Sequence, residues 1–117
     1  MTTTDRELLE LAAKAAGTRL EWIGDTSFDC TKLKAGKPTC KGTLWTPLHD
    51  DGDALRLAVK LGVIIGTYAS YSTVDLLSPN DRIETVTVWH SETSGDPYAA
   101  TRCAIVRAAA AIGRAMP

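Results

Sequence analysis

The chain has 117 residues, of which 44% are hydrophobic and 23% are charged, and its formal net charge is -1. These values are typical of one soluble globular domain, residues 1–117, and they exclude a global electrostatic attraction to nucleic acid or to anionic membranes. No apolar run approaches the ~20 residues of a membrane span, and no basic region precedes an apolar stretch at the N-terminus. We therefore expect no membrane partner, no signal peptide and a cytoplasmic location.

The chain contains three cysteines, Cys30, Cys40 and Cys103, and no CxxC pair. An odd number of cysteines without an export signal favours reduced thiols. A zinc site would require Cys30 and Cys40 to converge with a residue such as His49, which their spacing does not favour. We expect no metal and no cofactor, and we interpret Cys103 as a small apolar residue on a helix.

The first helix is predicted over residues 5–16. Thr4 and Glu7 have the spacing of a capping box, an apolar stripe with helical spacing follows, and Gly17 suits the left-handed residue just past the end.

The next stretch has the composition of strands, with a short one over 20–23 and longer ones over 28–33 and 40–45. Turn residues separate the last two segments and predict a hairpin. A symmetric hairpin would place Cys30 opposite Cys40.

A second helix is predicted between Pro47 and Gly62. Negative charge at its start complements the positive end of the helix dipole, and one of three aspartates is expected to cap it: Asp50, Asp51 or Asp53. The same aspartates with His49 could form a metal or acid–base cluster, but capping explains consecutive carboxylates at a helix start.

Two further strands are predicted over 63–70 and 83–90, separated by a turn at 78–81, and we expect them to pair as an antiparallel hairpin. In the second strand, Val86 and Val88 share one face, and Thr85, Thr87 and Trp89 share the other. His90 has no evident partner, so the sequence supports no nucleophile–base pair.

The last helix is predicted from Pro97 to the C-terminus, with Asp96 as its N-cap. One stripe of this helix is apolar: Tyr98, Ile105, Ala109, Ile112 and Met116. A second stripe consists of small residues and permits close approach by a sheet, by another helix or by a second copy in a homodimer: Ala99, Cys103, Val106, Ala110 and Gly113.

These elements give the order α-β-β-α-β-β-α. We predict an α+β sandwich in which three helices pack on an antiparallel sheet of about four strands. The expected core comprises Leu57, Leu61, Ile64, Val86, Val88, Ile105 and Ile112.

Two groups of basic residues are candidate binding sites. The predicted hairpin tip carries Lys32, Lys34, Lys37 and Lys41 without an acid, and the last helix carries Arg102, Arg107 and Arg114. These side chains could contact nucleic-acid phosphates, an anionic ligand or a protein partner. A solvated loop tip and a solvated helix face are the alternative interpretations. Phosphate-binding glycine loops are absent from the sequence.

The segments 45–61 and 96–109 resemble small proteins encoded by phages and prophages of Gram-negative bacteria, in or near the phage ABA (α-β-α) sandwich and NinX-like families. The resemblance extends to segment 5–17. The lysine-rich hairpin and Cys103 depart from the shared pattern. The resemblance implies an accessory protein and carries over no catalytic residue.

We therefore expect a non-enzymatic protein that acts by stoichiometric binding, as an inhibitor of a bacterial defence system. Its partner would be a host protein complex or a small nucleotide signal. The alternatives are a nucleic-acid-binding module that uses the lysine-rich hairpin and a structural or regulatory homo-oligomer. An enzyme would require His49, His90 or Cys103 to lie in a pocket with acids.

Overall fold

The computed structural model describes residues 4–30, 43–78 and 80–117. The elements of these ranges follow in chain order: α1 (Asp5–Ala16), β1 (Leu20–Ile23), β2 (Thr26–Asp29), β3 (Thr43–Leu44), α2 (Asp51–Leu61), β4 (Ile64–Thr67), β5 (Tyr71–Leu77), β6 (Ile83–Trp89), the 3-10 turn η1 (His90–Thr93) and α3 (Pro97–Ala115). The α+β class with three helices is confirmed. The single four-stranded sheet is wrong, because the described strands form two antiparallel sheets of three strands each.

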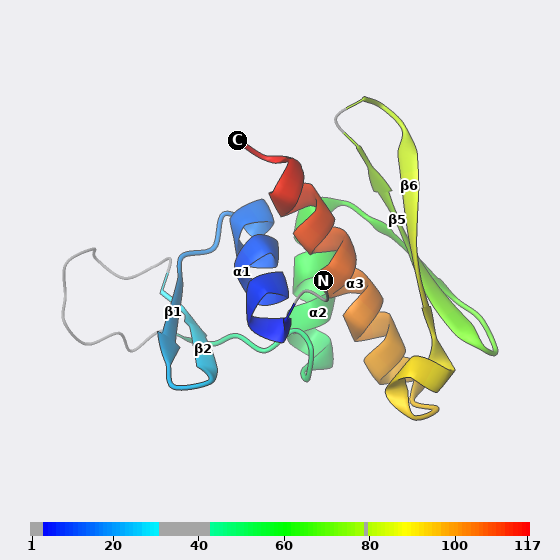
Figure 1. The fold of residues 1–117 in the computed structure, drawn as a ribbon, viewed down its shortest axis with the longest axis horizontal. Helices are drawn as coiled ribbons and strands as arrows, with labels where there is room; N and C mark the ends of the chain where they lie inside the picture. Colours follow the sequence, from blue (N-terminus) through cyan, green and yellow to red (C-terminus); the bar gives the residue numbers. More distant parts are fainter. Residues whose placement is uncertain (1–3, 31–42, 79) are drawn as a thin grey trace.

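Helix α3 is the centre of the fold. It packs against α1 and α2 on one side and against the strands of the β4-β5-β6 sheet, here called sheet B, on the other. Figure 1 shows sheet B at one end of the molecule and the β1-β2-β3 sheet, sheet A, beyond α1 at the other. Buried residues of the three helices and of sheet B form one apolar cluster.

The helix starts follow their local sequence. The side chain of Thr4 accepts a hydrogen bond from the backbone N–H of Glu7, that of Asp50 from Asp53, and that of Asp96 from Tyr98 and Ala99. Each cap satisfies backbone donors that the first turn leaves free. Thr4 and Asp96 are confirmed as caps, Asp50 is the one of the three candidate aspartates that caps α2, and the structure records the Thr4 half of the predicted capping box.

The small-residue stripe of α3 faces α1. A Cβ atom built on Gly113 would lie 2.0 Å from the backbone oxygen of Leu11. Val106, Ala110 and Gly113 are all buried. The predicted close approach is confirmed, and the partner element is a helix of the same chain.

Strand β5 was not predicted, and it changes the architecture of sheet B. The expected direct pairing of segment 63–70 with segment 83–90 is wrong, because β4 and β6 both pair with β5, which lies between them. The inner face of β5 carries Ser72, Val74 and Leu76, all buried. The serine interrupts the alternation of apolar residues that would have identified this strand.

The core of sheet B differs from the expected one at one position. Ile64, expected to be buried, exposes 66% of its surface, whereas its neighbour Ile65 packs against the core. Successive strand residues point to opposite faces, so only one of two adjacent isoleucines can point inward. Val86 and Val88 face the core as predicted.

In sheet A, β1 is confirmed and pairs with β2, whose Phe28 and Asp29 pair with β3. The rest of the predicted 28–33/40–45 hairpin, with the register of Cys30 and Cys40, lies outside the described residues. Cys30 is disulfide-bonded, so the expectation of reduced thiols is wrong for this residue. Cys103 is a free thiol.

Within the described ranges, no helix is both long enough and apolar enough to cross a lipid bilayer.

Candidate functional site

The basic candidates predicted from the sequence do not converge in the described part of the chain. Lys32, Lys34, Lys37 and Lys41 lie outside the described residues. On α3, Arg107 forms an ion pair with Glu92 at 3.5 Å, and Arg114 is exposed in the last turn. Arg102 is largely buried and has a different role.

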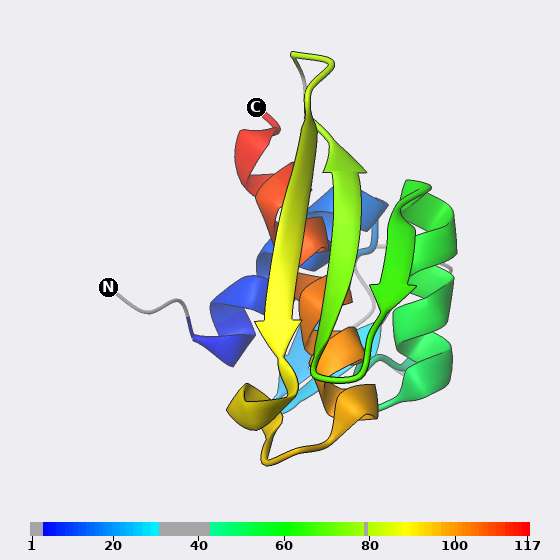
Figure 2. The same cartoon turned by 90° about the vertical axis from the view of Figure 1, so that its right-hand side faces the viewer.

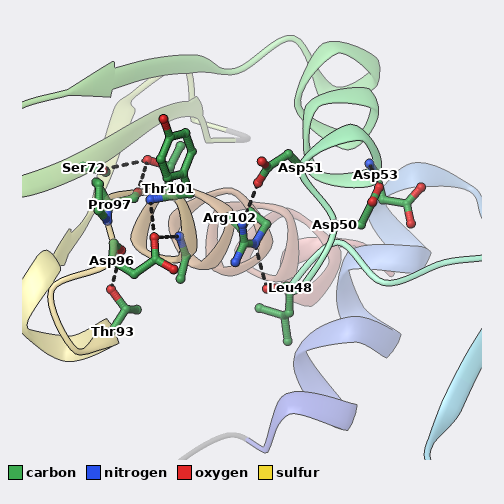
Figure 3. Close-up of polar contacts among 12 residues, drawn as sticks. Leu48, Asp50, Asp51, Asp53, Ser72, Thr93, Asp96, Pro97, Thr101 and Arg102 are labelled. Atoms are coloured by element: carbon green, nitrogen blue, oxygen red, sulfur yellow. Dashed lines mark hydrogen bonds and ion pairs between the residues drawn. The ribbon is translucent and has the colours of Figure 1, made fainter.

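Arg102 joins segment 96–109 to segment 45–61. Its Nε donates to the backbone oxygen of Leu48 at 3.0 Å, and its Nη1 donates to Asp51 at 2.6 Å, as Figure 3 shows. The Arg102 side chain exposes only 15% of its surface. The guanidinium therefore ties the start of α2 to α3 and is engaged inside the fold.

The aspartates at the start of α2 are also engaged. Asp50 caps the helix, and the buried Asp53 accepts hydrogen bonds from the backbone N–H of Thr46 at 2.9 Å and from Arg56 at 2.7 Å. No trio of His, Cys, Asp or Glu side chains among the described residues is arranged to hold a metal ion. The capping interpretation holds for Asp50, and Asp53 fastens the preceding turn to the helix.

His90 has a partner that the sequence did not reveal. Its Nε2 lies 3.3 Å from Oγ of Ser72, which lies 2.8 Å from Oγ1 of Thr101. Thr101 donates in turn to the backbone oxygen of Pro97, as Figure 3 shows. Ser72 is completely buried. A serine without solvent access does not meet a substrate in this conformation, so these contacts fix the β5–α3 packing.

Cys103 is partly buried on α3, close to the Arg107–Glu92 pair. Burial raises the pKa of the Cys103 thiol above its ordinary value, and this effect outweighs the lowering of the pKa by Arg107. A thiol with a raised pKa holds little thiolate at neutral pH and is a poor nucleophile.

We expect iodoacetamide to alkylate Cys103 more slowly in the folded protein than in urea at pH 8, as measured by mass spectrometry of the Cys103 peptide. The folded protein retains the thiol proton to higher pH than the unfolded chain does.

The free energy of unfolding should therefore fall as the pH rises from the unfolded-state pKa of the Cys103 thiol through its folded-state pKa. Equal alkylation rates in the two states would contradict this assignment.

A pocket of about 300 Å³ lies between the first turn of α1, the β1–β2 turn and residues 46–49. Asp5, Arg6, Asp25 and His49 supply its charged and titratable lining. Beside it, the Arg6 guanidinium lies 4.5 Å from the centre of the Trp22 ring. Its two carboxylates and one guanidinium make the charged lining net negative, which disfavours a phosphate-rich ligand.

The outer face of sheet B, turned away from α3, is the most distinctive described surface. Figure 2 shows the sheet in front of the helices, with no described segment crossing this face. Five large apolar or aromatic side chains on it each expose between 52% and 71% of their surface: Ile64, Tyr68, Leu77, Ile83 and Trp89. Exposed apolar patches on one face can mark interaction sites in soluble proteins.

An aromatic row crosses one end of the outer face. The rings of Tyr68 and Tyr71 stack with their centres 4.7 Å apart, and the centre of the Trp89 ring lies 5.0 Å from that of Tyr71. Glycine at position 66 leaves room for the Tyr68 ring, because a Cβ atom at this position would lie 3.0 Å from Cε2 of that ring. The three rings therefore contact one another in a single row on this surface.

The rest of the outer face is mixed at the centre, where Ile64 lies beside Asp75, and aliphatic at the far end. Across β5 and β6, Thr73 pairs with Thr87, Asp75 with Thr85, and Leu77 with Ile83. Thr85 donates a hydrogen bond to Asp75 at 2.7 Å. The outer face thus has apolar ends and a single carboxylate in the middle.

The sequence contained one signal for this surface. Thr85, Thr87 and Trp89 were correctly predicted to share a face, but a face of threonines beside one tryptophan does not by itself identify a binding site. The contributions of β4 and β5 became visible only when β5 was placed between the other strands. Comparisons with protein-family models, with curated proteins and with solved structures found no match.

Proposed function

We propose that this protein is a non-enzymatic accessory protein that acts by stoichiometric binding, and that it contacts a protein partner through the outer face of sheet B. The observation that carries the proposal is the exposed aromatic row at one end of this face, together with the exposed Leu77–Ile83 pair at the other end. The cores of protein interfaces are enriched in aromatic side chains and depleted of charged ones. Tyrosine and tryptophan are also the residues whose truncation costs most binding energy.

The biological setting of the proposal comes from the resemblance of segments 45–61 and 96–109 to phage accessory proteins. We propose that the protein inhibits a bacterial defence system in the cytoplasm of the infected or lysogenic host. Disulfides are rare in that compartment. Cys30 directly follows β2 of sheet A, which lies beyond α1 from sheet B (Figure 1), so the proposed binding does not depend on the redox state of Cys30.

A host protein suits the outer face better than a small nucleotide signal does. Small ligands are bound in concave sites that bury most of their surface, and nucleotide phosphates require cations. The outer face is an open sheet surface, and the pocket near Trp22 has a net negative lining. The alternative of a nucleic-acid-binding module rests on lysines outside the described residues, and steeply salt-dependent binding remains its test.

The proposal predicts that Trp89→Ser weakens partner binding about 30-fold, because truncation of a hot-spot aromatic side chain costs roughly 2 kcal/mol or more. The first readout is phage plating on bacteria that carry a panel of defence systems, with and without the protein. We expect the wild-type chain to restore plating against at least one system and Trp89→Ser to lose most of this effect.

Val59→Ser is the matched control. Val59 exposes 73% of its surface but lies on α2, away from the outer face, so this variant should protect phage as the wild type does. Circular dichroism would establish that both variants fold. Absence of protection against every system would refute the proposed inhibition, and equal losses in the two variants would refute the outer face as its site.

A further inference from the structure

We infer that the outer face of sheet B binds a positively charged protein surface, with an arginine or lysine of the partner placed against Asp75. The inference rests on the proposed function and specifies the chemistry of the partner. Asp75 is the one charged residue that the strands contribute to the middle of the outer face, between its aromatic and aliphatic ends.

Asp75 lacks a cationic partner in the described part of the chain. Its carboxylate accepts one hydrogen bond, from Thr85 at 2.7 Å, and no described arginine or lysine forms an ion pair with it. A partner that covers the outer face removes water from this carboxylate, which is costly unless a cation replaces the water. Arginine suits the position, because its planar group binds carboxylates through two donors and stacks on aromatic rings.

The charges of sheet B argue against nucleic acid on this face. Its three strands carry Asp75 and Glu84 and contain no lysine or arginine. Aromatic side chains on a sheet can stack with unpaired bases, but affinity for nucleic acid depends on cations that neutralise the phosphates. The strands of sheet B supply the aromatic groups without the cations.

A second copy of the chain is also a poor occupant. Three strands of up to seven residues span roughly 14 by 24 Å, an area on the order of 350 Å² per copy. A stable interface requires about 800 Å² from each partner. Stacking two such faces about a two-fold axis through their centres would also bring the two Asp75 carboxylates together.

An interface with a different protein can extend beyond the flat outer face of sheet B. The β5–β6 hairpin extends beyond the helices at its turn end, as Figures 1 and 2 show, and a partner of another shape can reach around it. The charge of Asp75 therefore favours a heterologous protein with a basic surface.

The first experiment places the photo-cross-linking residue p-benzoylphenylalanine at Thr87 on the outer face and, as a control, at Lys60 on α2. Each protein is irradiated in lysate of the defence-positive bacteria in which the wild type protects phage. We expect a nuclease-resistant protein adduct from position 87 and none from position 60. A nuclease-sensitive adduct, or an adduct with a second copy of the chain, would overturn the inference.

In the second experiment, the partner captured by cross-linking is identified by mass spectrometry and purified. Its affinity for the full chain is then measured. We expect Asp75→Asn to raise the Kd at least tenfold and Asp75→Lys at least a hundredfold. Glu84→Gln, which removes a carboxylate on the same strand pair but from the other face, should change the Kd by less than twofold. Circular dichroism controls for the folding of each variant.

The two proposals fail differently. A partner that binds through position 87 with an unchanged Kd for both Asp75 variants overturns the charge inference and leaves the proposed function standing. Failure of the protein to protect phage or to form any complex overturns the proposed function and, with it, the inference.

Discussion

Gly113→Ala is expected to lower the free energy of unfolding by about 3 kcal/mol, the upper part of the range for overpacked core positions. The added Cβ atom would lie 2.0 Å from the backbone oxygen of Leu11 and 2.9 Å from its carbonyl carbon. Backbone atoms have no rotamer with which to move aside, so α1 must shift away from α3. That shift loosens the contact between two helices that supply much of the apolar cluster.

Urea denaturation followed by circular dichroism measures this effect, and Gly52→Ala is the matched control. A Cβ atom on Gly52 would meet the Arg56 guanidinium nitrogens at 3.2 Å and an Asp50 carboxylate oxygen at 3.3 Å. The Asp50 oxygen caps the helix and the Arg56 guanidinium is bound to Asp53, but both side chains need to yield by only a few tenths of an ångström, and alanine is favoured over glycine within a helix by up to ~1 kcal/mol. Gly52→Ala should therefore cost much less stability than Gly113→Ala. Equal stability of Gly113→Ala and the wild type would show that α1 and α3 are not in close contact.

Arg102→Met is expected to cost about 2 kcal/mol of folding free energy, because it removes two charge-assisted hydrogen bonds from a mostly buried position. The backbone oxygen of Leu48 loses its donor, and the turn that precedes α2 loses its attachment to α3. Methionine retains most of the apolar stem, so the loss reports mainly on the guanidinium. Arg102→Lys should fall between wild type and Arg102→Met, because an ammonium lacks the fork that reaches both acceptors.

Arg114→Met is the matched control on the same helix. Arg114 is exposed in the last turn of α3, and surface substitutions of this kind change stability by less than ~0.5 kcal/mol. Both substitutions remove one positive charge, so a general charge effect is identical in the two variants. If Arg102→Met destabilises the chain no more than Arg114→Met does, Arg102 is not a structural link and returns to the group of candidate binding residues.

The sequence by itself determined the helices and their starts. The boundaries of α1 and the capping roles of Thr4 and Asp96 agree with the structure, and Asp50 caps α2 as one of three candidate aspartates. Capping depends on contacts between residues two or three positions apart, which are adjacent in the sequence as well as in space. The close approach permitted by the small-residue stripe of α3 was predictable for the same reason, although its partner was not.

The arrangement of the strands was decided by the tertiary structure. The strand propensity of β5 is masked by the buried Ser72, whose hydrogen-bond partners His90 and Thr101 lie 18 and 29 residues away. Only this remote pairing makes an inward-facing serine acceptable. Likewise, which of Ile64 and Ile65 is buried depends on the face of β4 that α3 covers.

The candidate site also depends on contacts between segments that are distant in the sequence. Tyr68 and Tyr71 flank the short β4–β5 turn, and Trp89 joins their row only because β6 pairs with β5. Arg102, a candidate for ligand binding by sequence, became a structural link once Leu48 and Asp51 were placed beside it. Local sequence determined where each element begins, because caps and periodicity act over a few residues. Which side chains stay exposed was decided by packing between distant segments.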